Sequence, residues 1–163
     1  MAATVQIGEK NSGAGTFTDK TSGTIRFKNA DNATVDLVNP MVKPPSGTDY
    51  SFEKWLILKV IGGTYSQITN IAAYMDGSSG LGTGVGLYAK AVTTFATPAE
   101  ATSASGYTDA FSYTSGAPLS LGAGPFTSTG EKGDHLVMML TVGSTASGGL
   151  TPSETLTIAW DEI

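Results

Sequence analysis

The sequence contains no cysteine, and only 14% of its 163 residues are charged. Without cysteine the chain has no disulfide, no thiolate metal site and no cysteine nucleophile. A single histidine, His135, leaves no cluster of histidine metal ligands. Glycine is abundant instead, at 21 residues. A surface built mainly from Ser, Thr, Asn and Gly suits contact with other proteins, because burying hydroxyl and amide groups costs less than burying ions.

Long apolar runs and targeting signals are missing as well. No window approaches the roughly 18 apolar residues of a membrane span. The start, MAATVQIGEK, lacks the basic residues and apolar run of a secretory signal. We therefore expect a soluble chain that is made in the cytoplasm and has no membrane partner. A net charge of −5 gives no attraction to a phosphate backbone, so nucleic acid is not an expected partner.

Short apolar segments predict strands along the whole chain. They span 2–8, 23–29, the two arms of 52–76, 85–92, part of 117–130, 134–142 and 155–161. One short helix, starting at Pro98, is the only exception. Many short strands with turn-rich connections predict an all-β fold, a two-sheet antiparallel β-sandwich that is jelly-roll-like with long loops. The length predicts a single domain, 1–163.

The stretch 52–76 is the longest apolar region, and we interpret it as two strands joined at Gly62-Gly63. Apolar residues fall on both faces of its first arm, so this strand is predicted to be covered on both sides. Leu56, Leu58 and Val60 share the face that we assign to the core. Trp55 and Ile57 lie on the other face, where we expect the edge of the second sheet or a neighbouring subunit.

Two other segments are expected to make contacts between subunits. Residues 1–22 are predicted to form a flexible or subunit-contacting N-terminal arm. The loop 30–50 contains three prolines, Pro40, Pro44 and Pro45. It is longer than loops in compact domains usually are, so we expect contact with a neighbouring subunit to order it.

The sequence contains no recognisable catalytic or cofactor-binding motif, so no catalytic residue, cofactor or metal site is predicted. The glycine run 80–86 has neither the G-x-G-x-x-G spacing nor the Gly-Lys-Ser/Thr ending of phosphate-binding loops. His135 is interpreted as a strand-edge residue near solvent, because the adjacent Asp134 would point to the opposite face of the strand. Calcium held by Asp31, Asn32 and Asp36, or by Asp76 and Ser78, is a weaker alternative.

Aromatic residues are the remaining candidates for a binding site. Trp160 lies in an apolar strand face, which favours core packing, as it does for Trp55. Tyr50, Tyr107 and Tyr113 lie in predicted loops, where tyrosine is typical of protein interfaces and also stacks on sugars. The complete set of interface candidates is Trp55, Ile57, Pro40, Pro44, Pro45, Tyr50, Tyr107 and Tyr113.

Two strings, GGTYSQITNIAAYMDGSSGLGTGVGLYAK at 62–90 and GDHLVMMLTVGSTASGGLTPSETLTIAWDE at 133–162, resemble small virion structural proteins of tailed bacteriophages. Such proteins decorate or cement the capsid, commonly as trimers with β-sandwich or jelly-roll folds. The resemblance implies a homotrimer that binds the major capsid protein and has no enzymatic activity. It points to no particular binding residue. The negative charge favours the outer capsid surface, because packaged nucleic acid would repel it.

Two alternatives stay open. The first is a carbohydrate-binding jelly-roll module of a virion surface or adhesin protein, with the loop tyrosines as its contacts. The second is an enzyme such as a glycan hydrolase, which would need paired acids across a cleft. The acidic residues lie mostly at predicted strand ends, where carboxylates normally meet water, and this favours the non-enzymatic interpretation.

Overall fold

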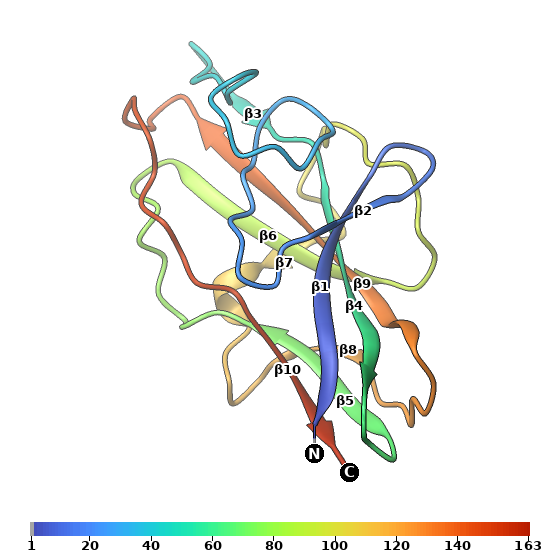
Figure 1. Ribbon diagram of the computed structural model, residues 1–163. Helices are drawn as coiled ribbons and strands as arrows, with labels where there is room; N and C mark the ends of the chain where they lie inside the picture. Colours follow the sequence, from blue (N-terminus) through green and yellow to red (C-terminus); the bar gives the residue numbers. More distant parts are fainter. Residues whose placement is uncertain (1) are drawn as a thin grey trace.

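The computed structural model describes residues 2–163, and in this range the chain folds almost entirely as strands (Figure 1). The elements in order are β1 (Ala3–Asn11), β2 (Thr16–Asp19), β3 (Thr48–Tyr50), β4 (Lys54–Gly63), β5 (Ile68–Tyr74), β6 (Val85–Val92), β7 (Thr108–Asp109), the 3-10 helix η1 (Ala110–Ser112), β8 (Leu119–Gly122), β9 (Gly130–Gly143) and β10 (Thr157–Glu162). No helix of the described residues is long and apolar enough to cross a membrane.

The strands form two antiparallel sheets. The larger sheet has the order β2-β1-β4-β9-β6-β7, and β3 adds to the end of β9. The smaller sheet has the order β10-β5-β8. The predicted all-β, two-sheet antiparallel sandwich is therefore confirmed, whereas the jelly-roll arrangement stays a prediction.

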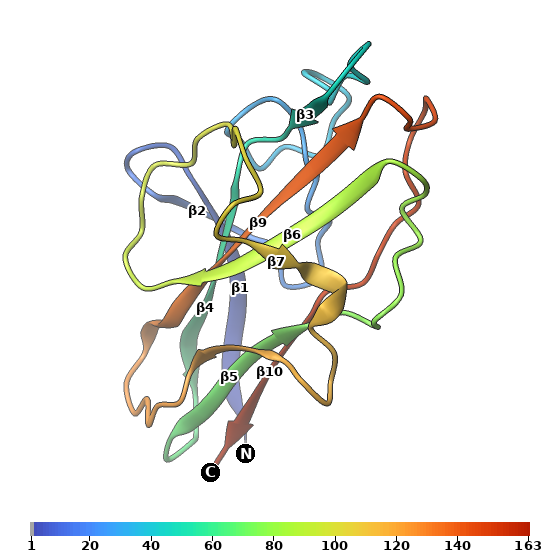
Figure 2. The same ribbon diagram turned by 180° about the vertical axis from the view of Figure 1, so that it is seen from behind.

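The core fills the space between the sheets, but the smaller sheet covers only part of the larger one. Leu56, Leu58 and Leu136 of the larger sheet pack with Ile68 and Ile71 of the smaller sheet. The smaller sheet lies at the end of the molecule that holds both termini, as Figures 1 and 2 show. The other end of the inner face is covered by the irregular segment 20–47.

The centre of the outer face of the larger sheet is buried too, although residues 2–163 place no second sheet there. Trp55 and Ile57 are only 3% and 2% exposed. Phe95, from the loop 93–107, packs edge-on against Trp55 with ring centroids 5.4 Å apart. Phe17 of β2 fills the space beside Gly8, which pairs with Ile57. The prediction that β4 is covered on both faces is confirmed, and this chain's own segments provide the cover.

The two arms of the central stretch do not pair with each other. β4 continues through Gly63, β5 starts at Ile68, and the two strands belong to different sheets. Gly63 has a φ of 100° and lies against the backbone of Ala3, where a Cβ would not fit. The junction predicted at Gly62-Gly63 is therefore the last part of β4, and the chain crosses between the sheets just after it.

Segment 23–29 was predicted to be a strand, but it has irregular structure. Its backbone groups bond outside any regular ladder, because Asn29 N–H donates to the Asn39 carbonyl and Phe52 N–H donates to the Lys28 carbonyl. Lys28, within this segment, is only 1% exposed. The strand prediction is wrong because this segment packs over the open end of the sandwich.

The predicted helix at Pro98 is absent from the structure. Pro98 is buried in an extended loop. Glu53 N–H donates to the Ala99 carbonyl, and Ala101 N–H donates to the Ser51 carbonyl. Bonds to the start of β4 thus replace the bonds that a helix would form within itself.

The prediction of a flexible arm is also wrong for most of residues 1–22, of which Met1 lies outside the described residues. β1 pairs with β4 on one side and β2 on the other, so it is an internal strand of the larger sheet. The short turn between β1 and β2 returns the chain to the sheet. The sequence signal for this hairpin is the turn Ser12-Gly13-Ala14-Gly15, which lies inside the predicted arm.

Candidate functional site

Three lysine side chains anchor the start of the loop 30–47. Their ammonium groups donate to three successive backbone carbonyls: Lys54 to Asn32 at 2.7 Å, Lys20 to Ala33 at 2.6 Å and Lys28 to Thr34 at 3.0 Å. Lys28 and Lys54 are each 1% exposed. An ammonium group offers three donors and no acceptor, so it suits a cluster of carbonyl oxygens. Long-range hydrogen bonds thus order a segment that has almost no regular secondary structure.

Two carboxylates balance these buried charges. Glu9 is 0% exposed and lies 2.9 Å from the Lys54 ammonium and 3.8 Å from that of Lys20. Asp36 lies 2.9 Å from the Lys28 ammonium, and this hydrogen bond lowers the pKa of Asp36. Sequence reasoning missed Glu9. Its signal was the alternation in β1, which places Glu9 on the same inward face as Val5 and Ile7.

The oxygens suggested as calcium ligands are bound by protein donors in this structure. Asp31 accepts from the Asn11 side chain at 2.8 Å and from Ser12 N–H at 2.7 Å. The Asn32 carbonyl and the Asp36 carboxylate bind lysine ammonium groups. Across residues 2–163, no group of three or more histidine or acidic side chains is placed to hold a metal ion.

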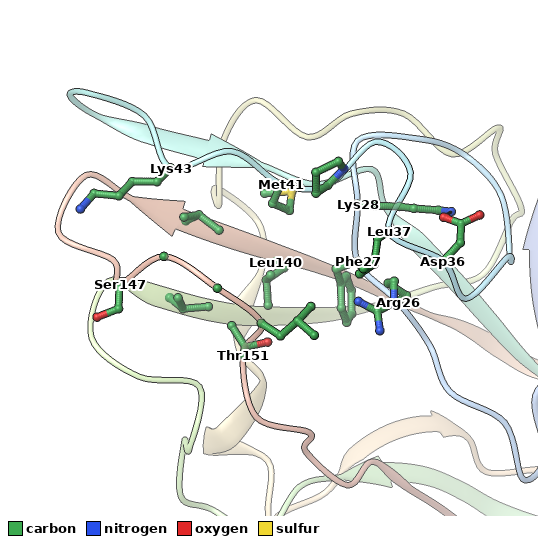
Figure 3. A pocket seen from close by; sticks show the side chains of 16 residues that line it. Arg26, Phe27, Lys28, Asp36, Leu37, Met41, Lys43, Leu140, Ser147 and Thr151 are labelled. Carbon is green, nitrogen blue, oxygen red and sulfur yellow. Dashed lines mark hydrogen bonds and ion pairs between the residues drawn. The ribbon is translucent and has the colours of Figure 1, made fainter.

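Beyond this anchor, the loop forms one wall of a groove with a volume of about 180 Å³, shown in Figure 3. We call it the apical groove, because it lies at the end of the molecule away from the termini. Its opposite wall is the segment Ser147 to Thr151, which follows β9. Phe27, Leu140 and Val142 contribute apolar side chains to it. Two loops far apart in sequence therefore enclose an apolar surface above the end of the larger sheet.

Exposed apolar side chains gather around the apical groove. Seven large apolar residues of the described chain are well exposed, and five of them lie on its two loops. These five are Val35, Leu37, Val38, Val42 and Leu150, with exposures from 47% to 72%. Single exposed apolar residues are ordinary, but a cluster of them marks a binding surface.

The lining of the groove carries an excess of positive charge in an acidic protein. Arg26, Lys28 and Lys43 contribute three cations against one carboxylate, Asp36. Lys28 is paired with Asp36, whereas Arg26 and Lys43 form no ion pair with any described residue. Nε of Arg26 is buried without a hydrogen-bond acceptor. Arg26 and Lys43 lie toward opposite ends of the groove in Figure 3.

The predicted proline contacts lie on the groove side of the molecule. Pro40 lines the apical groove and is exposed. Pro44 is partly buried and Pro45 is exposed, both later in the same loop. Trp55 and Ile57 lie elsewhere and are already covered by their own chain, so they present no surface to a partner.

The three predicted tyrosines are half-buried and lie on separate elements. Tyr50 is in β3, and Tyr113 packs against the core. The Tyr107 hydroxyl donates to Glu53, and the Lys90 ammonium lies 3.9 Å from the Tyr107 ring centroid. Burial, with the carboxylate of Glu53, raises the pKa of Tyr107. The structure thus does not bring these tyrosines together into one stacking site.

His135 is buried, not at a strand edge near solvent. It lies in β9, an internal strand of the larger sheet, and is 6% exposed. Its ring packs against Trp55 and Phe95 with centroids 5.6 Å and 5.7 Å away. Burial is the main cause that lowers the pKa of His135, and the charge of Lys10 adds to it. The prediction of a solvent-near position is wrong because Phe95, from the loop 93–107, covers this histidine.

The apical groove has the features of a binding surface. It offers apolar surface and two cations without an ion-pair partner among the described residues, and no histidine lines it. Such a surface can hold apolar and anionic groups of another molecule. In comparisons with known proteins, no family model, curated protein or solved structure matches this chain.

Proposed function

We propose that this chain is a virion structural protein that binds the outside of a bacteriophage capsid. As a homotrimer it would cement or decorate neighbouring major capsid subunits. The observation that carries this proposal is the cluster of exposed apolar residues around the apical groove, on a loop anchored by buried lysines. A preordered loop loses little conformational entropy on binding, so more of the contact energy appears as affinity.

A cementing role needs binding and no turnover. A subunit that binds the assembled lattice better than free capsid subunits shifts the equilibrium toward the intact particle by mass action. The net charge of −5 disfavours contact with packaged nucleic acid and so favours the outer surface. The low content of charged residues supports repeated protein contacts, since few ions lose their hydration.

The test measures oligomeric state and binding to capsids that lack the protein. Light scattering during size exclusion should give a trimer, and the trimer should sediment with the capsids. The double change Leu37→Asp and Leu150→Asp should abolish sedimentation without unfolding, because both side chains are already exposed. Ile61→Asp is the matched control, since Ile61 is exposed at 47% away from the groove. A monomer that does not bind capsids would contradict the proposal.

Carbohydrate binding is a weaker candidate. The aromatic contacts expected for it are half-buried and separate, and Tyr107 is bound to Glu53. A glycan array that gave a specific hit, lost on Tyr107→Ala or Tyr113→Ala, would favour this function over the capsid role.

A further inference from the structure

We infer that the apical groove binds an extended segment of a partner protein in which apolar side chains are flanked by carboxylates. This inference rests on the proposed binding role and adds the chemistry of the partner. Three separate properties of the groove carry it: its apolar lining, its unpaired cations and its unpaired backbone.

The apolar lining selects an apolar side chain. Phe27, Leu140 and Val142 line the groove, and Leu37 and Leu150 border it while 65% and 72% exposed. A volume of about 180 Å³ is close to that of apolar cavities, about 150 Å³, that accept a benzene-sized group. Aliphatic side chains of a partner would therefore bury the lining and both bordering leucines.

The charges of the groove select carboxylates. The buried Nε of Arg26 has no acceptor, and a buried donor without an acceptor is unfavourable. Asp36 already accepts through its Oδ1 from Lys28 at 2.9 Å and from Val38 N–H at 3.0 Å, and it forms no ion pair with Arg26. The planar guanidinium matches a carboxylate well. Lys43, toward the other end of the groove, provides a second contact for a carboxylate of the partner.

The backbone of one wall is open to hydrogen bonds from a partner chain. Residues 147–151 form no hydrogen bond with any other described residue, so their N–H and carbonyl groups are free. Side chains added at Gly148 or Gly149 would meet open space. The segment bends at Gly148 and Gly149, with a φ of 112° at Gly149, so it offers a partner backbone individual hydrogen bonds and not a regular strand ladder. A nucleic acid fits less well, because its phosphates would meet an apolar lining.

The test uses a fluorescent octapeptide with two central leucines flanked on each side by two glutamates. Fluorescence anisotropy should show saturable binding that weakens with salt. A lysine-flanked version and a glycine-centred version should each bind at least about tenfold more weakly, which corresponds to one lost charged or apolar contact. The double variant Arg26→Gln and Lys43→Gln should lose about tenfold affinity and most of the salt dependence. Lys59→Gln is the matched control, because Lys59 lies over Phe17, away from the groove.

Other outcomes would overturn the inference. Equal binding of the lysine-flanked peptide, or no change in the double variant, would remove the role of charge. Self-association abolished by Leu37→Asp would identify a second copy as the occupant instead. Groove-dependent capsid binding without peptide binding would refute this partner chemistry and leave the capsid role standing. Peptide binding without capsid binding would refute the capsid role and leave this partner chemistry standing.

Discussion

At the residue scale, the most unusual group is Glu9, a carboxylate with no exposed surface between two lysine ammonium groups. A buried ion pair is weak evidence for stability, since desolvation offsets much of the attraction. Removing one partner is different, because it leaves the other charge buried and unpaired. Glu9 therefore matters for the order of the loop above it more than for its own contact energy.

Glu9→Gln should lower the free energy of unfolding by about 3–5 kcal/mol, because Lys54 and Lys20 lose their counter-charge. Urea unfolding measures the change. Adding Lys54→Met to Glu9→Gln should cost less than the sum of the single changes. Glu131→Gln is the matched control: its pair with Lys10 is partly exposed, so it should cost less than about 1 kcal/mol. Equal losses at Glu9 and Glu131 would contradict a special role for the buried network.

His135 should make stability depend on pH. Its pKa is lowered in the folded state, so below about pH 6.5 the unfolded chain binds the proton more readily. The contribution is present above that pH and is lost as the pH falls, by about 1.4 kcal/mol for each unit of difference between the two states. Lys10 and Glu131 are the charged groups that act on this histidine, and they oppose each other.

The measurement compares unfolding free energies at pH 7.5 and 5.5 for the wild type and for His135→Phe. The phenylalanine ring keeps the packing against Trp55 and Phe95 but does not titrate. The wild type should lose more stability over this range than the variant. Parallel losses in both proteins would assign the pH dependence to other groups.

At the element scale, the loop 93–107 behaves as a lid on the outer face of the larger sheet. Trp55→Ala should cost about 3–5 kcal/mol and leave the oligomeric state unchanged, because Trp55 packs within its own chain. Phe95→Ala should cost less and should increase quenching of tryptophan fluorescence by acrylamide. A changed oligomer in Trp55→Ala, measured by light scattering, would show that this face also meets another subunit.

Strands with a clear pattern of apolar residues along the chain were predictable from the sequence. The boundaries of β6 match the predicted strand 85–92, and β9 and β10 contain most of their predicted spans. Apolar residues alternate in β6 and β10, so the pattern alone defines their faces. In β9 they form a continuous run that is buried from His135 to Thr141. Segment 23–29 has the same alternation but no partner strand. The structure of this segment depends on which acceptors the Lys28 ammonium group binds. The local sequence pattern does not identify those acceptors.

The candidate site was less predictable than the fold. Contact with a neighbouring subunit was predicted to order the loop with Pro40, whereas its anchors are Lys20, Lys28 and Lys54 of the same chain, which meet only after folding. Lysine is almost never fully buried, so sequence reasoning assigns it to solvent. The opposite wall of the groove comes from a connector more than 100 residues away, and nothing in its composition indicated a binding surface.

At the scale of the whole molecule, the two termini lie together at the end away from the apical groove, as Figures 1 and 2 show. Ala3 N–H donates to the Glu162 side chain at 2.9 Å, which links the first and last strands. A domain fused to either terminus should therefore leave peptide binding unchanged. A short insertion between Gly148 and Gly149, which have open space around them, should abolish peptide binding but not folding. Fluorescence anisotropy measures peptide binding, and thermal melting measures folding. Loss of peptide binding in the terminal fusions would contradict a binding site at the end opposite the termini.

Because its lysine anchors are buried, opening of the loop 30–47 can be measured by chemical modification of lysine. Amine-acylating reagents attack only an unprotonated, accessible amine, and Lys28 and Lys54 are inaccessible while their ammonium groups hold the carbonyls of the loop. Lys43 on the same loop is exposed and has no ion-pair partner among the described residues. Acylation of Lys28 relative to Lys43 thus reports how often the loop opens. Once acylated, Lys28 can no longer pair with Asp36, so each opening event is recorded permanently in the mass of the chain.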